Sequence, residues 1–403
     1  MPVVKPSVNE HKKDSPNIVL RDAPQLTDPS AQLIGKITAD IRAMGLVGEE
    51  DKALLMYLAY SSRKLNKPLS VIIKGPSGSG KDEIQRRPAD LMPPEDVKDF
   101  MSITPQALYY GEPGWLEHKI ILGGERKHED SEEQRDKTAA IRQMLSHGYI
   151  TKSTVVDGLK GREIRQDGPV SYSETTTKDS IFQEDANRCL QINTSADVEL
   201  TRRILKAQSA NYMPGQDSAQ ERKEIIRREH HIFQQRLQCV AVRIPYAEIL
   251  ADKVPTGQIE IRRIFGQMLS LIGVIAWIHQ FQRVPNTYGQ LEATLDDYRL
   301  ARRLALGSLH LAIGLGKDYE KCKAIENKLP KGKPFTTTEA AQALGDKSRK
   351  VTLDALAKLQ EAGVIHCFVK GQGNRPATWR WTGVSVDELI LPGVETVEAA
   401  LRE

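Results

Sequence analysis

The chain of 403 residues carries 57 Lys and Arg against 53 Asp and Glu, a formal net charge of +4 that by itself indicates no class of partner. Hydrophobic residues make up 39% and charged residues 27%, which excludes a wholly disordered chain and suits two or three domains. Four scattered cysteines form no C-x-x-C pair, so we expect reduced thiols in a cytoplasmic protein, not a disulfide framework or a cysteine zinc site.

The first 200 residues predict an α/β domain preceded by a tail. Residues 1–30 are polar and predict a flexible N-terminal tail. Helical spacing then alternates with short apolar runs, which predicts an ATP-binding type of domain at 31–200 built on a mainly parallel sheet. The expected elements are two helices between Ala31 and Lys64, strands at Leu69–Ile73, Lys119–Leu122 and before Thr175, a helix at Thr138–His147 and a hairpin at 149–165. A further segment is expected to open at Leu190–Ile192.

Residues 201–330 predict a helical lid or linker domain. Long helices are expected at Glu221–Gln238, Ile261–Phe281 and Asp296–Leu315. The longest apolar stretch, Phe265–Phe281, is interrupted by polar residues and is shorter than the ~20 residues that a bilayer requires. It therefore predicts a buried helix and no membrane span.

A glycine-rich loop with the pattern G-x-x-x-x-G-K follows the first expected strand. It consists of Gly75, Pro76, Ser77, Gly78, Ser79, Gly80 and Lys81. Glycines let successive backbone N–H groups hold phosphate oxygens, the positive end of the following helix adds to this, and Lys81 would reach the β- and γ-phosphates. The sequence predicts nucleotide binding, against the alternative of a glycine turn with a chance lysine.

Two acidic positions around this loop bear on Mg²⁺ and hydrolysis. Asp82 stands where the motif normally carries the Ser or Thr that binds Mg²⁺. Either Asp82 is a replacement metal ligand, or its charge weakens nucleotide binding and abolishes hydrolysis. The second strand ends in Gly123-Gly124-Glu125, so it lacks the usual Asp and keeps the Glu. Glu125 is the candidate that polarises the attacking water, unless it only begins the charged stretch 125–137 of a solvated loop.

Several blocks of sequence together resemble a known family. They are Met56–Lys64, Lys67–Lys74, Ile141–Gly148, Asp167–Pro169, Thr175–Thr177, Glu184–Arg188, Arg262–Phe265 and Ala293–Tyr298. From about residue 50 to 310, the chain resembles the AAA+ ATPase part of the primase/helicase-type replication proteins of phages and mobile elements. It is more distantly similar to the minichromosome-maintenance-like group.

This resemblance implies an ATP- and Mg²⁺-dependent ATPase that acts on DNA as a homo-oligomer, such as a hexameric ring. It implies that Thr176 or Thr177 senses the γ-phosphate and that Arg188 is an arginine finger reaching a neighbouring subunit's nucleotide. Arg202 or Arg203 would be a second phosphate sensor. The alternatives are threonines of an ordinary strand and an Arg188 that pairs with Glu184 one turn earlier.

The resemblance also implies that the expected hairpin at 149–165 lines a DNA channel. Its residues Lys160 and Arg162, together with Lys152 and Arg165, suit contact with DNA phosphates. A solvated hairpin is the alternative.

Residues 331–403 predict a winged helix DNA-binding domain with a C-terminal tail. Thr336 and Glu339 have the spacing of a capping box, and a helix, a second helix and two strands joined by a turn follow. Between residues 331 and 381, nine Lys and Arg stand against four Asp and Glu. The candidate DNA contacts are Lys347, Arg349 and Lys350 at the start of the recognition helix and Arg375 in the wing. A winged helix that only contacts proteins is the alternative.

These features together predict an ATP-dependent helicase or helicase-like replication protein of a phage or mobile element, bound to single- or double-stranded DNA. The alternative is a nucleotide-gated DNA-binding initiator or regulator with little or no turnover. A small-molecule kinase is a weaker third possibility, because it would also keep the phosphate loop. No primase polymerase domain is visible, so a separate primase or polymerase partner would supply priming.

Overall fold

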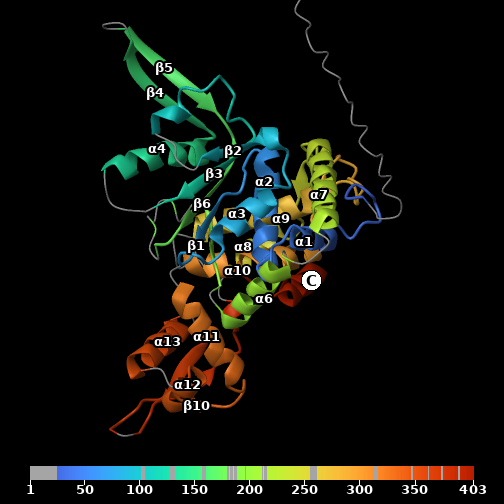
Figure 1. Ribbon diagram of the computed structural model, residues 1–403. Helices are drawn as coiled ribbons and strands as arrows, with labels where there is room; N and C mark the ends of the chain where they lie inside the picture. Colours follow the sequence, from blue (N-terminus) through green and yellow to red (C-terminus); the bar gives the residue numbers. More distant parts are fainter. Residues whose placement is uncertain are drawn as a thin grey trace, which may run out of the picture.

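A five-stranded parallel sheet lies at the centre of the computed structural model (Figure 1), in the order β2-β3-β6-β1-β7. The strands are β1 (Val71–Lys74), β2 (Val97–Phe100), β3 (Lys119–Glu125), β6 (Val170–Thr176) and β7 (Leu190–Asn193). The structure describes residues 25–100, 105–126, 132–156, 160–178, 181, 185, 188–195, 197–210, 212, 216–254, 261–312, 316–345, 348–361, 363–373, 375–388 and 391–403. The predicted mainly parallel α/β domain is confirmed. Strand β2 was not expected, because its four residues show neither an apolar run nor an alternation of apolar and polar side chains.

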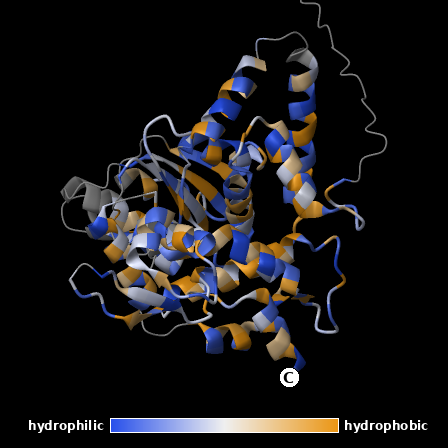
Figure 2. Ribbon diagram, turned by 90° about the horizontal axis from the view of Figure 1, so that it is seen from below, coloured by the Kyte–Doolittle hydropathy of each residue, from blue (hydrophilic) through white to orange (hydrophobic). Residues whose placement is uncertain are grey.

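Helices pack on this sheet and place its main core between them. They are α1 (Leu33–Ala43), α2 (Glu50–Ser61), α3 (Lys81–Ala89) and α4 (Glu132–His147), with short 3-10 turns η1 (Ser62–Lys64), η2 (Pro94–Asp96) and η3 (Pro105–Leu108). Helix α2 is buried along almost its whole length. Figure 2 shows hydrophobic residues along the sides of the helices that meet other elements, and hydrophilic residues on the outer sides.

A long antiparallel hairpin of β4 (Tyr149–Val156) and β5 (Lys160–Asp167) projects from the sheet domain (Figure 1). Its register pairs Tyr149 with Asp167 and Val156 with Lys160. The predicted hairpin is confirmed. The residues of its turn, 157–159, lie outside the described residues.

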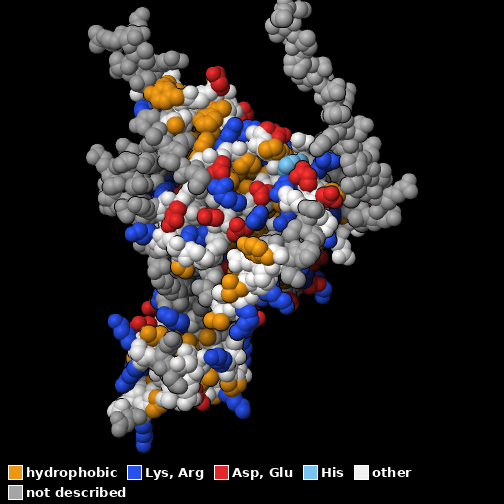
Figure 3. Space-filling model, viewed as in Figure 1, with side chains coloured by type: hydrophobic (Ala, Val, Ile, Leu, Met, Phe, Trp, Pro, Cys, Tyr) orange, Lys and Arg blue, Asp and Glu red, His pale blue; other side chains and the backbone are white. Residues whose placement is uncertain are grey.

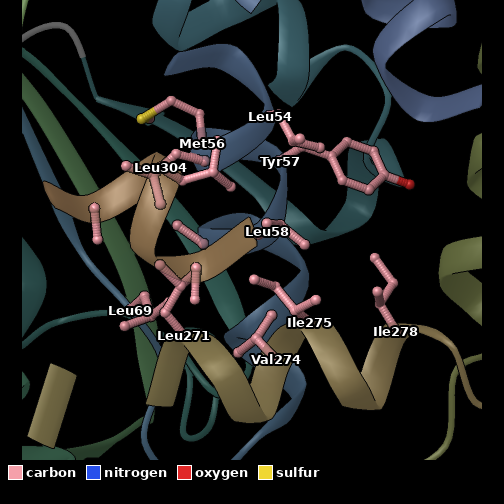
Figure 4. Packing of buried hydrophobic residues seen from close by; sticks show 14 of the residues in the cluster. Leu54, Met56, Tyr57, Leu58, Leu69, Leu271, Val274, Ile275, Ile278 and Leu304 are labelled. Carbon is pink, nitrogen blue, oxygen red and sulfur yellow. The ribbon is translucent and has the colours of Figure 1, made fainter. Parts of the chain in front are cut away.

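The chain after residue 197 is mainly helical. Its elements are α6 (Val198–Ala210), α7 (Gln216–Arg236), α8 (Ala247–Lys253), α9 (Ile261–Ile278), α10 (Leu295–Ala312) and a small parallel sheet of β8 (Val242–Arg243) and β9 (Leu291–Glu292). In the described part of the chain, α9 alone is long and apolar enough to cross a membrane. Figure 4 shows Leu271, Val274 and Ile275 of α9 facing α2 in the main core. The prediction of a buried helix is confirmed.

Residues 316–388, here called the C-terminal module, have a small hydrophobic core of their own. It contains α11 (Gly316–Lys328), β10 (Phe335–Thr336), α12 (Thr337–Ala343), α13 (Arg349–Glu361), β11 (Ile365–Val369), β12 (Thr378–Trp381) and η4 (Val386–Glu388). Its three strands pair in the order β10-β12-β11. Cys322 and Ile325 of α11 belong to this core, so the module begins before the boundary expected at residue 331.

The chain end returns from the C-terminal module to the main core. Helix α14 (Val394–Arg402) contacts α8 and α10, and Leu391, Val394 and Val397 are buried among the residues of the main core. The Tyr298 hydroxyl of α10 donates a hydrogen bond to the Pro392 carbonyl at 2.7 Å. The segment predicted as a C-terminal tail is therefore a packed structural element.

Candidate nucleotide-binding site

The glycine-rich loop connects the end of β1 to the start of α3, as its pattern requires. Gly78 and Gly80 have φ angles of +76° and +83°, a backbone conformation that side chains with a Cβ rarely adopt. Gly80 directly precedes α3, so the free N–H groups of the first helical turn face the loop. Pro76, Ser77 and Gly78 are exposed, which leaves the loop open to a ligand from solvent.

Lys81 is buried and folded back onto the loop. Its Nζ donates hydrogen bonds to the carbonyls of Gly75 and Pro76, each at 2.9 Å, and the residue is 6% exposed. A charged ammonium is thus held directly under the loop, where bound phosphates would lie. Asp82, the next residue, is exposed on the first turn of α3.

Thr194 closes the other side of the loop and was not singled out by the sequence. An ideal Cβ on Gly75 would lie 1.8 Å from Thr194 Oγ1, so a larger residue here would require Thr194 or the loop to move. The Thr194 and Ser79 hydroxyls share a hydrogen bond at 2.7 Å. The pairing of β7 beside β1 produces this contact. A hydroxyl residue at the end of a strand was its only sequence signal.

Glu125 reaches the same edge of the sheet through an irregularity in β3. The register against β6 shifts between Leu122 and Glu125, and Gly123 lies in the shifted segment. An ideal Cβ on Gly123 would lie 2.8 Å from the Tyr172 hydroxyl oxygen, which explains the glycine. Glu125 is exposed at the carboxyl end of its strand. In parallel α/β sheets this edge is where ligands bind.

Thr176 joins the loop to β3 through hydrogen bonds. Its carbonyl accepts the N–H of Gly75 at 3.1 Å, and its buried hydroxyl donates to the carbonyl of Arg126 at 2.8 Å. Thr177 is exposed one residue further. The strand that carries these threonines therefore separates Glu125 from the phosphate loop.

Gln85 fastens the loop helix to the sheet and was also missed from the sequence. Its side-chain amide donates to the Gly123 carbonyl and to the Ser173 hydroxyl, both at 3.0 Å. The Tyr60 hydroxyl donates to the Gln85 carbonyl at 3.1 Å. Because Gln85 lies one turn after Lys81, α3 and the strand of Glu125 are held in a fixed relation.

A buried ionic cluster lies beside this edge. Arg126 pairs with Glu174 and with Asp185, and Arg142 of α4 also pairs with Asp185. The Tyr172 hydroxyl donates to Glu174 at 2.7 Å. Burial raises the pKa of Tyr172 well above its ordinary value, so this hydroxyl stays protonated as a donor.

The predicted arginine positions have other contacts in this chain. Arg188 Nε donates to the Ser146 hydroxyl of α4 at 2.8 Å, while Glu184 lies outside the described residues. Arg202 pairs with Glu199 at 2.6 Å and is mostly exposed. Arg203 lies 3.9 Å from Glu50.

The predicted nucleic-acid contacts are distributed over two projecting parts of the molecule. Lys160 and Arg162 belong to β5, but their side chains lie outside the described residues, as does Lys347. Arg349 and Lys350 are exposed on the first turn of α13, and Arg375 is exposed between β11 and β12. Figure 3 shows Lys and Arg side chains at several places around the visible face of the C-terminal module, among hydrophobic and other side chains.

The parallel sheet, the glycine loop between a strand and a helix, and the buried Lys81 define a P-loop NTPase of α/β fold. A family model described as the MTBMA_p00010 P-loop domain matches residues 32–234. The chain therefore belongs to this family. The match extends through α6 and almost all of α7, beyond the boundary expected at residue 200. No curated protein matches the chain.

Proposed function

We propose that the protein is a DNA-acting ATPase, a helicase or helicase-like replication protein of a phage or mobile element. The observation that carries this proposal is the arrangement at one sheet edge. There the phosphate loop with Lys81, the hydroxyl of Thr176 and the exposed carboxylate of Glu125 end three neighbouring strands. Motors of this class need phosphate binding and water activation at one place.

Each residue of the edge has a stated task in this proposal. Backbone N–H groups from Gly75 to Gly80 and the Lys81 ammonium hold the ATP phosphates. Asp82, an exposed carboxylate on the first turn of α3, would hold Mg²⁺, and the ion would neutralise charge on the phosphates. Glu125 orients and polarises the attacking water, and Arg188 acts on the nucleotide of a neighbouring subunit.

The DNA-binding part of the proposal rests on charge and shape. The C-terminal module has the helix, helix and strand-pair order of a winged helix, and it exposes Arg349, Lys350 and Arg375. The β4–β5 hairpin projects from the sheet domain and carries Lys160 and Arg162. We propose a cytoplasmic homo-oligomer, such as a hexameric ring, that binds single- or double-stranded DNA and works with a separate primase or polymerase.

A second candidate function is favoured by one specific observation. Asp82 replaces the usual hydroxyl ligand, and Gly124 stands where the second strand normally carries an Asp. Both changes reduce the ordinary set of Mg²⁺ ligands. A nucleotide-gated DNA-binding initiator or regulator, with little or no turnover, would retain the phosphate loop under these conditions.

ATP hydrolysis by the purified chain, with and without single- and double-stranded DNA, separates the two functions. Turnover that DNA stimulates and that Lys81→Ala abolishes supports the motor. Nucleotide binding without turnover, measured in parallel by equilibrium binding, supports the gated binder. No binding by the wild-type chain would contradict both.

The role of Asp82 is tested by Asp82→Ser in the same assay. If Asp82 holds Mg²⁺ in place of the Asp that the second strand lacks, serine cannot replace it. We therefore expect the Mg²⁺-dependent rate of hydrolysis to fall in Asp82→Ser. A rate that rises instead would show that Asp82 is the residue that impairs hydrolysis. Glu83→Ser, on the same exposed turn, is the matched control.

A further inference from the structure

Arg126 directly follows Glu125, and its main chain is held on both sides. Its N–H donates to the Thr175 carbonyl at 2.8 Å, and its own carbonyl accepts the Thr176 hydroxyl at 2.8 Å. Both partners belong to the end of β6, which lies between β3 and β1. The peptide that carries Glu125 is therefore fastened to the strand beside the phosphate loop.

The guanidinium of Arg126 is enclosed by two acidic side chains. Its Nη1 lies 3.2 Å from Glu174 Oε2, and its Nη2 pairs with Asp185 Oδ2. The three side chains are 13%, 1% and 7% exposed in the order Arg126, Glu174 and Asp185, so both ion pairs are largely shielded from water. Such buried, doubly paired arginines hold a single geometry because the guanidinium is planar and its donors are fixed.

Asp185 connects this cluster to the segment that carries Arg188. The Asp185 carbonyl accepts the N–H of Arg188 at 2.9 Å, and its second carboxylate oxygen binds Arg142 Nε at 2.6 Å. Arg142 and Ser146 both lie on α4, and Ser146 accepts the hydrogen bond from Arg188. One continuous set of contacts therefore runs from Glu125 through Arg126 and Asp185 to Arg188.

We propose that Arg126 is a positioning residue for hydrolysis. It sets the place of the Glu125 carboxylate at the sheet edge and, through Asp185, fixes Glu125 relative to the segment of Arg188. In an oligomer, one side of this connection would face the chain's own nucleotide and the other the neighbour's. The inference rests on the proposed ATPase function and adds a residue that touches no nucleotide itself.

The test compares steady-state hydrolysis and nucleotide affinity in matched variants. Arg126→Gln alone leaves Glu174 as a buried unpaired charge, so the main variant is the double change Arg126→Gln/Glu174→Gln, which leaves the Arg142–Asp185 pair in place. Arg126→Lys keeps the charge but loses the forked geometry. Arg243→Gln removes an arginine from an exposed pair with Glu292 and is the control.

We expect the double variant to keep the thermal midpoint and the ATP affinity of the wild type while kcat falls about tenfold or more, with KM within about twofold. Arg126→Lys should have a kcat between those of the wild type and the double variant. It serves as the test if the double variant does not fold. A folded double variant with the kcat of the wild type would contradict the positioning role of Arg126 and leave the proposed ATPase function standing. Absence of turnover in the wild type and in Arg243→Gln would overturn the proposed function and this role with it.

Discussion

The phosphate loop shows how single residues are constrained from outside their own motif. Gly75 belongs to the G-x-x-x-x-G-K pattern, but its need for glycine comes from Thr194, more than a hundred residues later. Lys81 likewise lies against two loop carbonyls that the local sequence does not specify as partners. The motif identifies the loop in the sequence, whereas Thr194, directly after the neighbouring strand β7, constrains the conformation of the loop.

Gly75→Ala should weaken ATP binding by about tenfold or more, because the new Cβ would lie 1.8 Å from Thr194 Oγ1 and force the loop to move. The double variant Gly75→Ala/Thr194→Ala should recover part of the affinity, since the clashing hydroxyl is gone. Equilibrium nucleotide binding measures both. Gly266→Ala in α9, where a Cβ meets nothing within 4 Å, is the control. Unchanged affinity in Gly75→Ala would contradict this account of the loop.

The elements differ in how much of their structure is local. The helix α12 begins with the capping box of Thr336 and Glu339 that its sequence predicts. The junction between α10 and the C-terminal module is set by distant contacts instead. There the buried ring of His310 stacks on Tyr319 of α11, with centroids 3.9 Å apart, and its Nε2 lies 3.4 Å from the Val386 carbonyl.

This junction predicts a pH dependence of stability. Burial lowers the pKa of His310 to about 4, against the opposing effects of the Val386 and Leu306 carbonyls and of Asp387, and in the same direction as Arg302. The folded state holds the His310 ring neutral. The stability that this ring contributes is fully present above the ordinary pKa of 6.5, and it is lost progressively as the pH falls toward about 4. The free energy of unfolding should drop by about 2 kcal/mol between pH 7 and pH 5 on this account.

His310→Phe keeps the stacked ring and removes the titrating group. Chemical denaturation at several pH values should therefore give a flatter pH profile for the variant than for the wild type. The buried His230 remains in both proteins and cancels from the comparison. Parallel profiles would show that His310 does not titrate as its burial requires.

The first turn of α13 predicts a salt-dependent contribution to DNA binding. Arg349→Ala/Lys350→Ala should weaken binding to all DNA sequences and reduce the slope of log affinity against log salt by about 2, as expected for two lost phosphate contacts. Fluorescence anisotropy at several salt concentrations measures this slope. Lys253→Ala/Arg402→Ala removes the same charge from exposed positions on α8 and α14, outside the C-terminal module, and should leave the slope unchanged. Equal slopes in both double variants would argue against α13 as a DNA contact.

At the scale of the whole molecule, the chain end joins the two cores. The C-terminal module has its own hydrophobic cluster, yet the residues after it return to the main core. Leu391, Val394 and Val397 are buried there, at the side of α8 and α10. The C-terminal module is therefore attached to the main body at both of its ends, through α11 and through α14.

Truncation after Glu388 should destabilise the main body, although it removes no residue of the family-matched region. Loss of three buried side chains corresponds to about 4 kcal/mol, or a fall in thermal midpoint of about 5 °C or more. Truncation after Ala400 removes only exposed residues and should leave the midpoint unchanged. Equal midpoints for the two truncations would show that α14 adds nothing to the main core.

The sequence alone determined those features whose causes are local. The glycine loop, the strand before it, the hairpin, the buried helix α9 and the capped helix α12 follow from backbone freedom, side-chain periodicity and short-range hydrogen bonds. The parallel α/β class followed from the alternation of such elements. The short edge strand β2 and the chain-end helix α14 did not, because neither carries a periodic pattern long enough to stand out.

Only the tertiary structure decided which residues meet at the sheet edge. The order β2-β3-β6-β1-β7 brings Thr194 against Gly75 and places β6 between Lys81 and Glu125. It also buries Arg126, which lies in the charged stretch that the sequence allows as a solvated loop, between Glu174 and Asp185. Strand order depends on how distant segments share one core, and no local pattern records that choice.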